Sequence, residues 1–158
     1  MGGYMDNGKK LTALFVFLLS VAATASAQLN WTSFEHLNDS LRQEARPLLI
    51  FIHADWCAYC KRQESEVFAG PAVVQKLNTD YYCLKLDAEG REALRFMGRS
   101  YQFISTGYET GQHELAQFLG SEDGQLSLPT TLVLDKSLQL KWRETSLVET
   151  DFLLELLE

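Results

Sequence analysis

The stretch that decides the fold is Ala54–Lys61, ADWCAYCK, which stands between an apolar run and a run of helix-forming residues. The apolar run before it, Leu48–Ile52, has the composition of a strand that is buried on both faces. The residues after it, Arg62–Phe68, contain neither glycine nor proline and are typical of a helix. Cys57 and Cys60 therefore fall where a strand passes into a helix, with Cys57 at or near the helix N-terminus.

The spacing of the two cysteines predicts a redox-active pair. Residues three apart on a helix share one face, so the sulfurs of Cys57 and Cys60 should lie close enough to form a disulfide. The free amides and the dipole of the first helical turn favour negative charge, which predicts a lowered pKa for the Cys57 thiol. Cys60, one turn further on, lacks this help. We therefore expect Cys57 to be the nucleophile and Cys60 the resolving cysteine.

The motif Trp-Cys-x-x-Cys-Lys at residues 56–61, following a buried strand, resembles the active site of the thioredoxin superfamily. The resemblance extends, more weakly, from about Trp31 to the C-terminus. It implies an α/β, thioredoxin-like fold with a central mixed β-sheet flanked by helices.

A second match to the family lies at Leu128-Pro129-Thr130, just before another apolar run. In thioredoxin-like proteins a cis proline at the start of that strand lies against the dithiol. The resemblance therefore implies a cis bond at Pro129 and a Leu128 backbone that pairs with an extended substrate. We also expect Trp56 to shield the dithiol and to offer a flat surface to a docked peptide. The alternatives are a trans proline at the first residue of a strand and a tryptophan that only packs at the strand end.

The surroundings of the cysteine pair depart from the family pattern. Thioredoxins usually carry a buried acid at the position that Phe51 occupies in this chain. Phe51 cannot accept or donate a proton. Either another group or water therefore takes the proton of Cys60, or the protein reduces disulfides more slowly than a standard thioredoxin. Lys85 matches a lysine near that acid and here needs another partner or an exposed tip. A protonated His53 would lower the pKa of the first thiol, unless it only closes the strand. Asp55 could cap the helix while adding a negative charge nearby.

The first 27 residues have the layout of a secretory signal peptide. Lys9 and Lys10 precede a short apolar run at 11–19, and Ala25-Ser26-Ala27 offers a small-residue cleavage site. The apolar run is short for a bilayer span of about 20 residues, which disfavours an uncleaved anchor. We expect a signal peptide over residues 1–27, a thioredoxin-like domain over 28–158 with no membrane span after cleavage, and a periplasmic location in a Gram-negative bacterium.

Charge and the remaining cysteine narrow the possible partners. Cleavage leaves 12 of the 14 basic and 20 of the 21 acidic side chains, a net charge near −8, which is unfavourable for binding nucleic acid or an anionic membrane. Cys83 falls in a second expected strand over 81–86 and is interpreted as a small buried hydrophobe, with a third redox thiol or a metal ligand as alternatives. We expect a monomer.

The chain between the second strand and Pro129 is longer than the family pattern requires, which predicts an insertion over about 99–124. We expect a helix over 92–97 before it and a short helix over His113–Leu119 within it, with His113 facing solvent. The insertion is either a rim or lid that restricts access to the dithiol, or a surface elaboration that packs on the body.

These features predict an exported thiol:disulfide oxidoreductase that reduces disulfides in substrate proteins and receives electrons from a membrane thiol donor. The Cys57–Cys60 disulfide is its redox centre, and no cofactor or metal is implied. Three alternatives remain: an oxidase or isomerase that uses the same chemistry in reverse, a copper or zinc chaperone, and a redox-inert scaffold. The chaperone would use Cys57 and Cys60 with His53 or Cys83, whereas a structural zinc site needs four ligands, usually in paired clusters.

Overall fold

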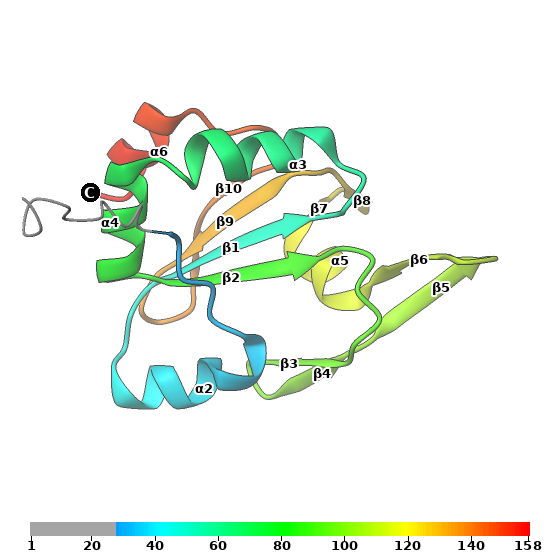
Figure 1. Cartoon of the computed structure of the whole chain (residues 1–158). Helices are drawn as coiled ribbons and strands as arrows, with labels where there is room; N and C mark the ends of the chain where they lie inside the picture. The colour runs from blue at the N-terminus through cyan, green and yellow to red at the C-terminus, as the bar shows by residue number, and fades with distance from the viewer. Residues whose placement is uncertain (1–27) are drawn as a thin grey trace, which may run out of the picture.

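The structure is a computed structural model and describes residues 28–158. The expected signal peptide over residues 1–27 lies outside the described residues. The chain folds around one four-stranded sheet with helices on both faces (Figure 1).

The central sheet is mixed, as expected, with the strand order β10-β9-β1-β2. Its strands are β1 (Leu48–His53), β2 (Tyr82–Asp87), β9 (Thr130–Leu134) and β10 (Leu140–Glu144). β1 runs parallel to β2 and antiparallel to β9, and β10 pairs antiparallel with β9. The five apolar residues that open β1 have no exposed surface, which explains their unbroken hydrophobic run.

Side chains alternate between the two faces of the sheet and define two apolar clusters. Leu49 and Phe51 join the cluster that contains both cysteines of the motif and the buried residues of α4 (Pro71–Asp80) and α6 (Thr150–Leu156). Leu48, Ile50 and Ile52 join the opposite cluster, beneath α2 (Phe34–Gln43) and part of the insertion. β1, β2 and β9 therefore each contribute to two cores, which is the arrangement of an α/β fold with covered faces.

The helix that carries the cysteines is continuous but changes its hydrogen-bonding pattern. It begins as α3 (Ala58–Arg62), with Cys57 as its N-cap, and continues as the π-helix η1 (Gln63–Val67). Gly70 precedes Pro71, which opens α4 as expected of a proline at the first helical position. Ser33 caps α2 by accepting a hydrogen bond from the amide of His36.

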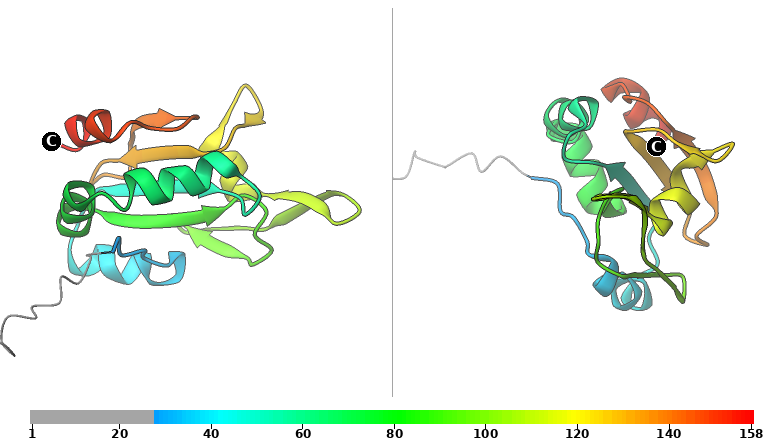
Figure 2. Two further views of the ribbon diagram at one scale, coloured as in Figure 1. Left: turned by 45° about the horizontal axis from the view of Figure 1, so that its top comes forward. Right: turned by 90° about the vertical axis from the view of Figure 1, so that its right-hand side faces the viewer.

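The insertion holds one helix, as expected, but the other elements in it and at its borders are short hairpins. β3 (Leu94–Phe96) pairs with β4 (Arg99–Tyr101), β5 (Phe103–Gly107) with β6 (Thr110–His113), and β7 (Ser121–Glu122) with β8 (Gln125–Leu126). The helix α5 (Glu114–Gly120) lies between β6 and β7. The β5–β6 hairpin projects beyond the end of β2, away from the body (Figures 1 and 2).

The helix predicted over 92–97 is wrong, because this segment is the first strand of the β3–β4 hairpin. Met97 and Gly98 both have positive φ, at 51° and 79°, as the two central residues of a tight hairpin turn require. Phe96 and Tyr101 are buried while Arg95 between them in the ladder points outward. The glycine interpreted as a helix stop is therefore a turn residue.

His113 is buried, contrary to the solvent-facing position expected from the sequence. Its ring has no exposed surface, and Nδ1 accepts a hydrogen bond from the amide of Leu115 at 3.1 Å. The other ring nitrogen, Nε2, must then carry the proton and donates to the carbonyl of Glu92 at 3.0 Å. The backbone amide of His113 donates to the carbonyl of Ala88 at 2.7 Å, which ties the insertion to the end of β2.

Candidate active site

Cys57 and Cys60 form a disulfide at the point where β1 gives way to α3. Their Cα atoms are 5.2 Å apart, and the amide of Cys60 donates a hydrogen bond to Sγ of Cys57 at 3.1 Å. Cys57 is 4% and Cys60 1% exposed, so Cys57 is slightly the more accessible. A thiolate at Cys57 would occupy the N-cap position, where a helix amide already points at the sulfur.

Trp56 and Tyr59 flank the disulfide on the surface, with 67% and 61% of their area exposed. The indole Nε1 of Trp56 donates to Oε1 of Glu89 at 3.0 Å, and the amide of Glu89 donates to Oδ1 of Asp87 at the end of β2. Trp56 is thus held at its edge while its faces remain open. This placement favours a contact surface over simple packing at the strand end.

The Leu128–Pro129 peptide bond is cis, as the family resemblance implied. Pro129 is buried directly before β9, and Thr130 pairs with Ile52 near the end of β1. Leu128 is partly buried and packs against the cluster that contains both cysteines. The fold therefore brings a segment some 70 residues downstream to the strand end from which the dithiol projects.

An aromatic stack occupies the place of the acid found in thioredoxins. Phe51 is fully buried, with its ring centroid 5.7 Å from that of His53 and 5.0 Å from that of Phe68. Burial is the main cause that lowers the pKa of His53, and the positive charge of Lys85 adds to the effect. The imidazole is therefore neutral at neutral pH and supplies no cation to stabilise a thiolate.

Lys85 finds its partner in Glu64, which the sequence interpretation did not single out. Lys85 lies opposite Phe51 in the β1–β2 ladder, and its Nζ is 2.7 Å from Oε2 of Glu64. About a third of each side chain is exposed. Glu64 stands four residues after Cys60, so helical spacing, together with the need of Lys85 for a partner, could have pointed to it.

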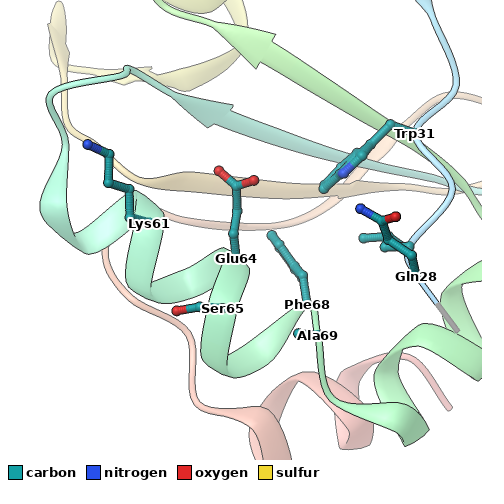
Figure 3. A pocket seen from close by; sticks show the side chains of 8 residues that line it. Gln28, Trp31, Lys61, Glu64, Ser65, Phe68 and Ala69 are labelled. Carbon is teal, nitrogen blue, oxygen red and sulfur yellow. The ribbon is translucent and has the colours of Figure 1, made fainter. Parts of the chain in front are cut away.

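Glu64 also lines a pocket between the cysteine-bearing helix and the N-terminal segment. Its side chain extends from the helix towards the sheet, between Lys61 and Phe68, with Trp31 on the far side (Figure 3). The pocket measures about 540 Å³. Its lining consists of Gln28, Leu29, Trp31, Lys61, Glu64, Ser65, Phe68 and Ala69.

Asp55 and Cys83 take no part in holding the pair. Asp55 is exposed, and Cys57 rather than Asp55 provides the side-chain cap of α3, so the capping role predicted for Asp55 is wrong. Cys83 is a free thiol that is 1% exposed, and burial raises its pKa to about 12. The interpretation of Cys83 as a buried hydrophobe is confirmed.

Within residues 28–158, His, Cys, Asp and Glu side chains form no group of three or more that could hold a metal ion. No helix in the same part of the chain combines the length and the apolarity needed to cross a bilayer.

Comparison with known proteins agrees with this geometry. The sequence model of the family described as Thioredoxin-like matches residues 30–135. The thiol:disulfide interchange protein DsbD of Salmonella typhimurium is 39% identical over 62 residues. That match covers 37% of this chain and only 11% of the relative.

Solved structures of low identity share the fold. A thioredoxin from Thermus thermophilus superposes with a TM-score of 0.57 at 16% identity, covering 82% of this chain and 85% of that one. The reduced C-terminal domain of DsbD from Neisseria meningitidis gives a TM-score of 0.50 at 17% identity, covering 78% and 89%.

Proposed function

Since the chain belongs to the thioredoxin-like family, we propose that it is an exported thiol:disulfide oxidoreductase that reduces disulfides in substrate proteins. One observation carries the proposal: the Cys57 sulfur lies at the N-cap of the helix and accepts a hydrogen bond from the Cys60 amide. A thiolate there is stabilised before any substrate arrives. The names of the DsbD relatives describe thiol:disulfide interchange, which is the same class of chemistry.

The reaction proceeds through a mixed disulfide. The Cys57 thiolate attacks one sulfur of a substrate disulfide, and the other substrate sulfur leaves as a thiolate that takes a proton from water. Cys60 then loses its proton and attacks Sγ of Cys57, which releases the second substrate sulfur. The substrate gains two electrons and two protons, and the protein ends with the Cys57–Cys60 disulfide.

Three residues around the pair are proposed to receive the substrate. Trp56 presents an exposed indole next to Cys57, and Leu128 with the cis Pro129 presents backbone near the same strand end. The carbonyl and amide of Leu128 can pair with an extended substrate segment. This arrangement brings the scissile disulfide towards the more exposed of the two cysteines.

The surroundings favour a reducing to intermediate potential. A strongly oxidising protein needs a strongly stabilised thiolate, and here His53 is neutral while Lys85 is paired with Glu64. The helix amides are the main source of stabilisation. The midpoint potential should therefore lie nearer to the value of about −270 mV for thioredoxin than to about −120 mV for DsbA.

We also propose a site of action and an electron donor. If residues 1–27 direct export, the domain works in the periplasm, where its disulfide must be reduced again by a thiol donor in the membrane. This proposal draws on the signal-like sequence and on the DsbD relatives.

The test is the midpoint potential of the Cys57–Cys60 pair, measured in glutathione or dithiothreitol buffers, together with the rate at which the reduced protein reduces a disulfide substrate. A potential below about −200 mV with rapid reduction that Cys57→Ser abolishes is the expected result. A potential near about −120 mV would instead identify an oxidant and refute the assignment as a reductase.

A further inference from the structure

A small pocket lies between the rim of the dithiol and the insertion. Its volume is about 150 Å³, below the roughly 300 Å³ at which small-molecule sites begin, so it suits one side chain rather than a cofactor. Two lining residues stand beside the dithiol, two follow β2, one belongs to the insertion and one comes directly after it: Trp56, Leu128, Ala88, Glu89, Gln112 and Leu126.

The wall that the insertion contributes is fixed by hydrogen bonds. The amide of His113, next to Gln112, donates to the carbonyl of Ala88, and the Gln112 side chain is hydrogen-bonded to that of Gln117 on α5. Leu126 lies on β8, which pairs with β7 directly after α5. These hydrogen bonds and the strand pairing hold this wall in a fixed position next to the dithiol.

The charge of the pocket favours a cationic side chain. The carboxylate of Glu89 accepts the indole hydrogen of Trp56 but forms no ion pair with any residue of 28–158. Asp55, adjacent to Trp56, is exposed and also forms no ion pair within that part of the chain. A lysine or arginine could lay its methylene stem along Trp56, Leu126 and Leu128 and bring its charge to Glu89.

We infer that this pocket is a specificity subsite, completed by Gln112 of the insertion and Leu126 directly after it, that accepts a basic side chain next to the cysteine of the substrate disulfide. The inference rests on the proposed function, because it concerns the substrate of the same dithiol. It assigns the insertion a role as a rim that selects substrates.

The test compares two synthetic peptides, each with one cysteine held as a mixed disulfide with glutathione, and with either lysine or glutamate on both sides of that cysteine. Acid quenching and chromatography give the second-order rate constant for reduction by the reduced full-length protein. The lysine peptide should react about fivefold faster, the ratio expected for one partly exposed ion pair, and the ratio should shrink in high salt.

Two variants locate the preference in the pocket. Glu89→Gln retains an oxygen that can accept from Trp56 but removes the charge, and should bring the ratio close to one. Gln112→Lys adds a cation from the insertion side and should favour the glutamate peptide. The matched controls are Gln125→Lys, which adds the same charge on exposed β8 outside the lining, and Glu155→Gln on α6.

The results distinguish failure of the subsite from failure of the proposed function. The subsite is supported if both pocket variants change the ratio and both controls leave it at the wild-type value. It is overturned, with the proposed function intact, if the wild type reduces both peptides equally or if the pocket variants behave like the controls. If neither peptide is reduced, the proposed function fails and the subsite with it.

Discussion

Replacing His113 with alanine should detach the insertion from the end of the sheet and destabilise the whole domain. The ring has no exposed surface, accepts from the Leu115 amide and donates to the Glu92 carbonyl. Loss of the N-cap bond costs about 1 kcal/mol, the unpaired carbonyl costs about 1 kcal/mol, and the lost ring leaves a cavity worth about as much again. The free energy of unfolding should therefore fall by about 3 kcal/mol.

Urea unfolding followed by tryptophan fluorescence measures this change, and two variants resolve its parts. His113→Asn retains a side-chain oxygen that can cap α5, but the shorter side chain cannot reach the Glu92 carbonyl. It should therefore lower the free energy of unfolding by about half as much as His113→Ala. His36→Ala, on the exposed face of α2, should cost about 0.5 kcal/mol or less. If His113→Ala were no more costly than His36→Ala, the interpretation of His113 as the anchor of the insertion would be refuted.

Three other changes test the surroundings of the dithiol. Glu64→Gln leaves the Lys85 cation unpaired beneath the helix, where its positive charge favours the thiolate. The pH midpoint for alkylation of the reduced pair should therefore move down by about half a pH unit. An upward shift would contradict this reasoning. In the oxidised protein, the Cys83 thiol should react with a thiol reagent at pH 8 only after denaturation, since burial raises its pKa to about 12; immediate reaction in native buffer would contradict its burial. Burial lowers the pKa of His53 in the folded chain. As the pH falls below about 6.5, the unfolded chain therefore binds a proton at His53 more readily than the folded chain does. The free energy of unfolding should accordingly fall as the pH is lowered below about 6.5. His53→Phe should lessen this dependence when unfolding is measured at pH 5 and pH 7.5, and an unchanged dependence would count against the stated cause.

The features that the sequence predicted correctly depend on local patterns. The apolar run before Cys57 becomes a fully buried strand, and the spacing of Cys57 and Cys60 gives the disulfide. The cis bond at Pro129 came from the family resemblance and not from composition, because few X–Pro bonds are cis and their neighbours do not mark them.

The features that the sequence missed depend on strand pairing and on buried main-chain partners, which the composition of one segment does not show. The β3 strand contains good helix formers, but pairing with β4 and the positive φ angles of Met97 and Gly98 decide its structure. His113 is polar and was expected in solvent, whereas two main-chain partners satisfy its ring in the core. Helical spacing from Cys60 makes Glu64 a candidate partner for Lys85, but the ion pair itself depends on the sheet register, which places Lys85 opposite Phe51.

The most direct test of the lowered pKa of Cys57 is the pH dependence of the rate at which iodoacetamide alkylates it in the Cys60→Ser variant. Cys83 is buried and should not react in the folded protein. The account predicts a midpoint well below the value of about 8.5 for an ordinary cysteine, because the helix amides stabilise the thiolate. A midpoint at or above that value would contradict the claim that this sulfur is prepared for nucleophilic attack.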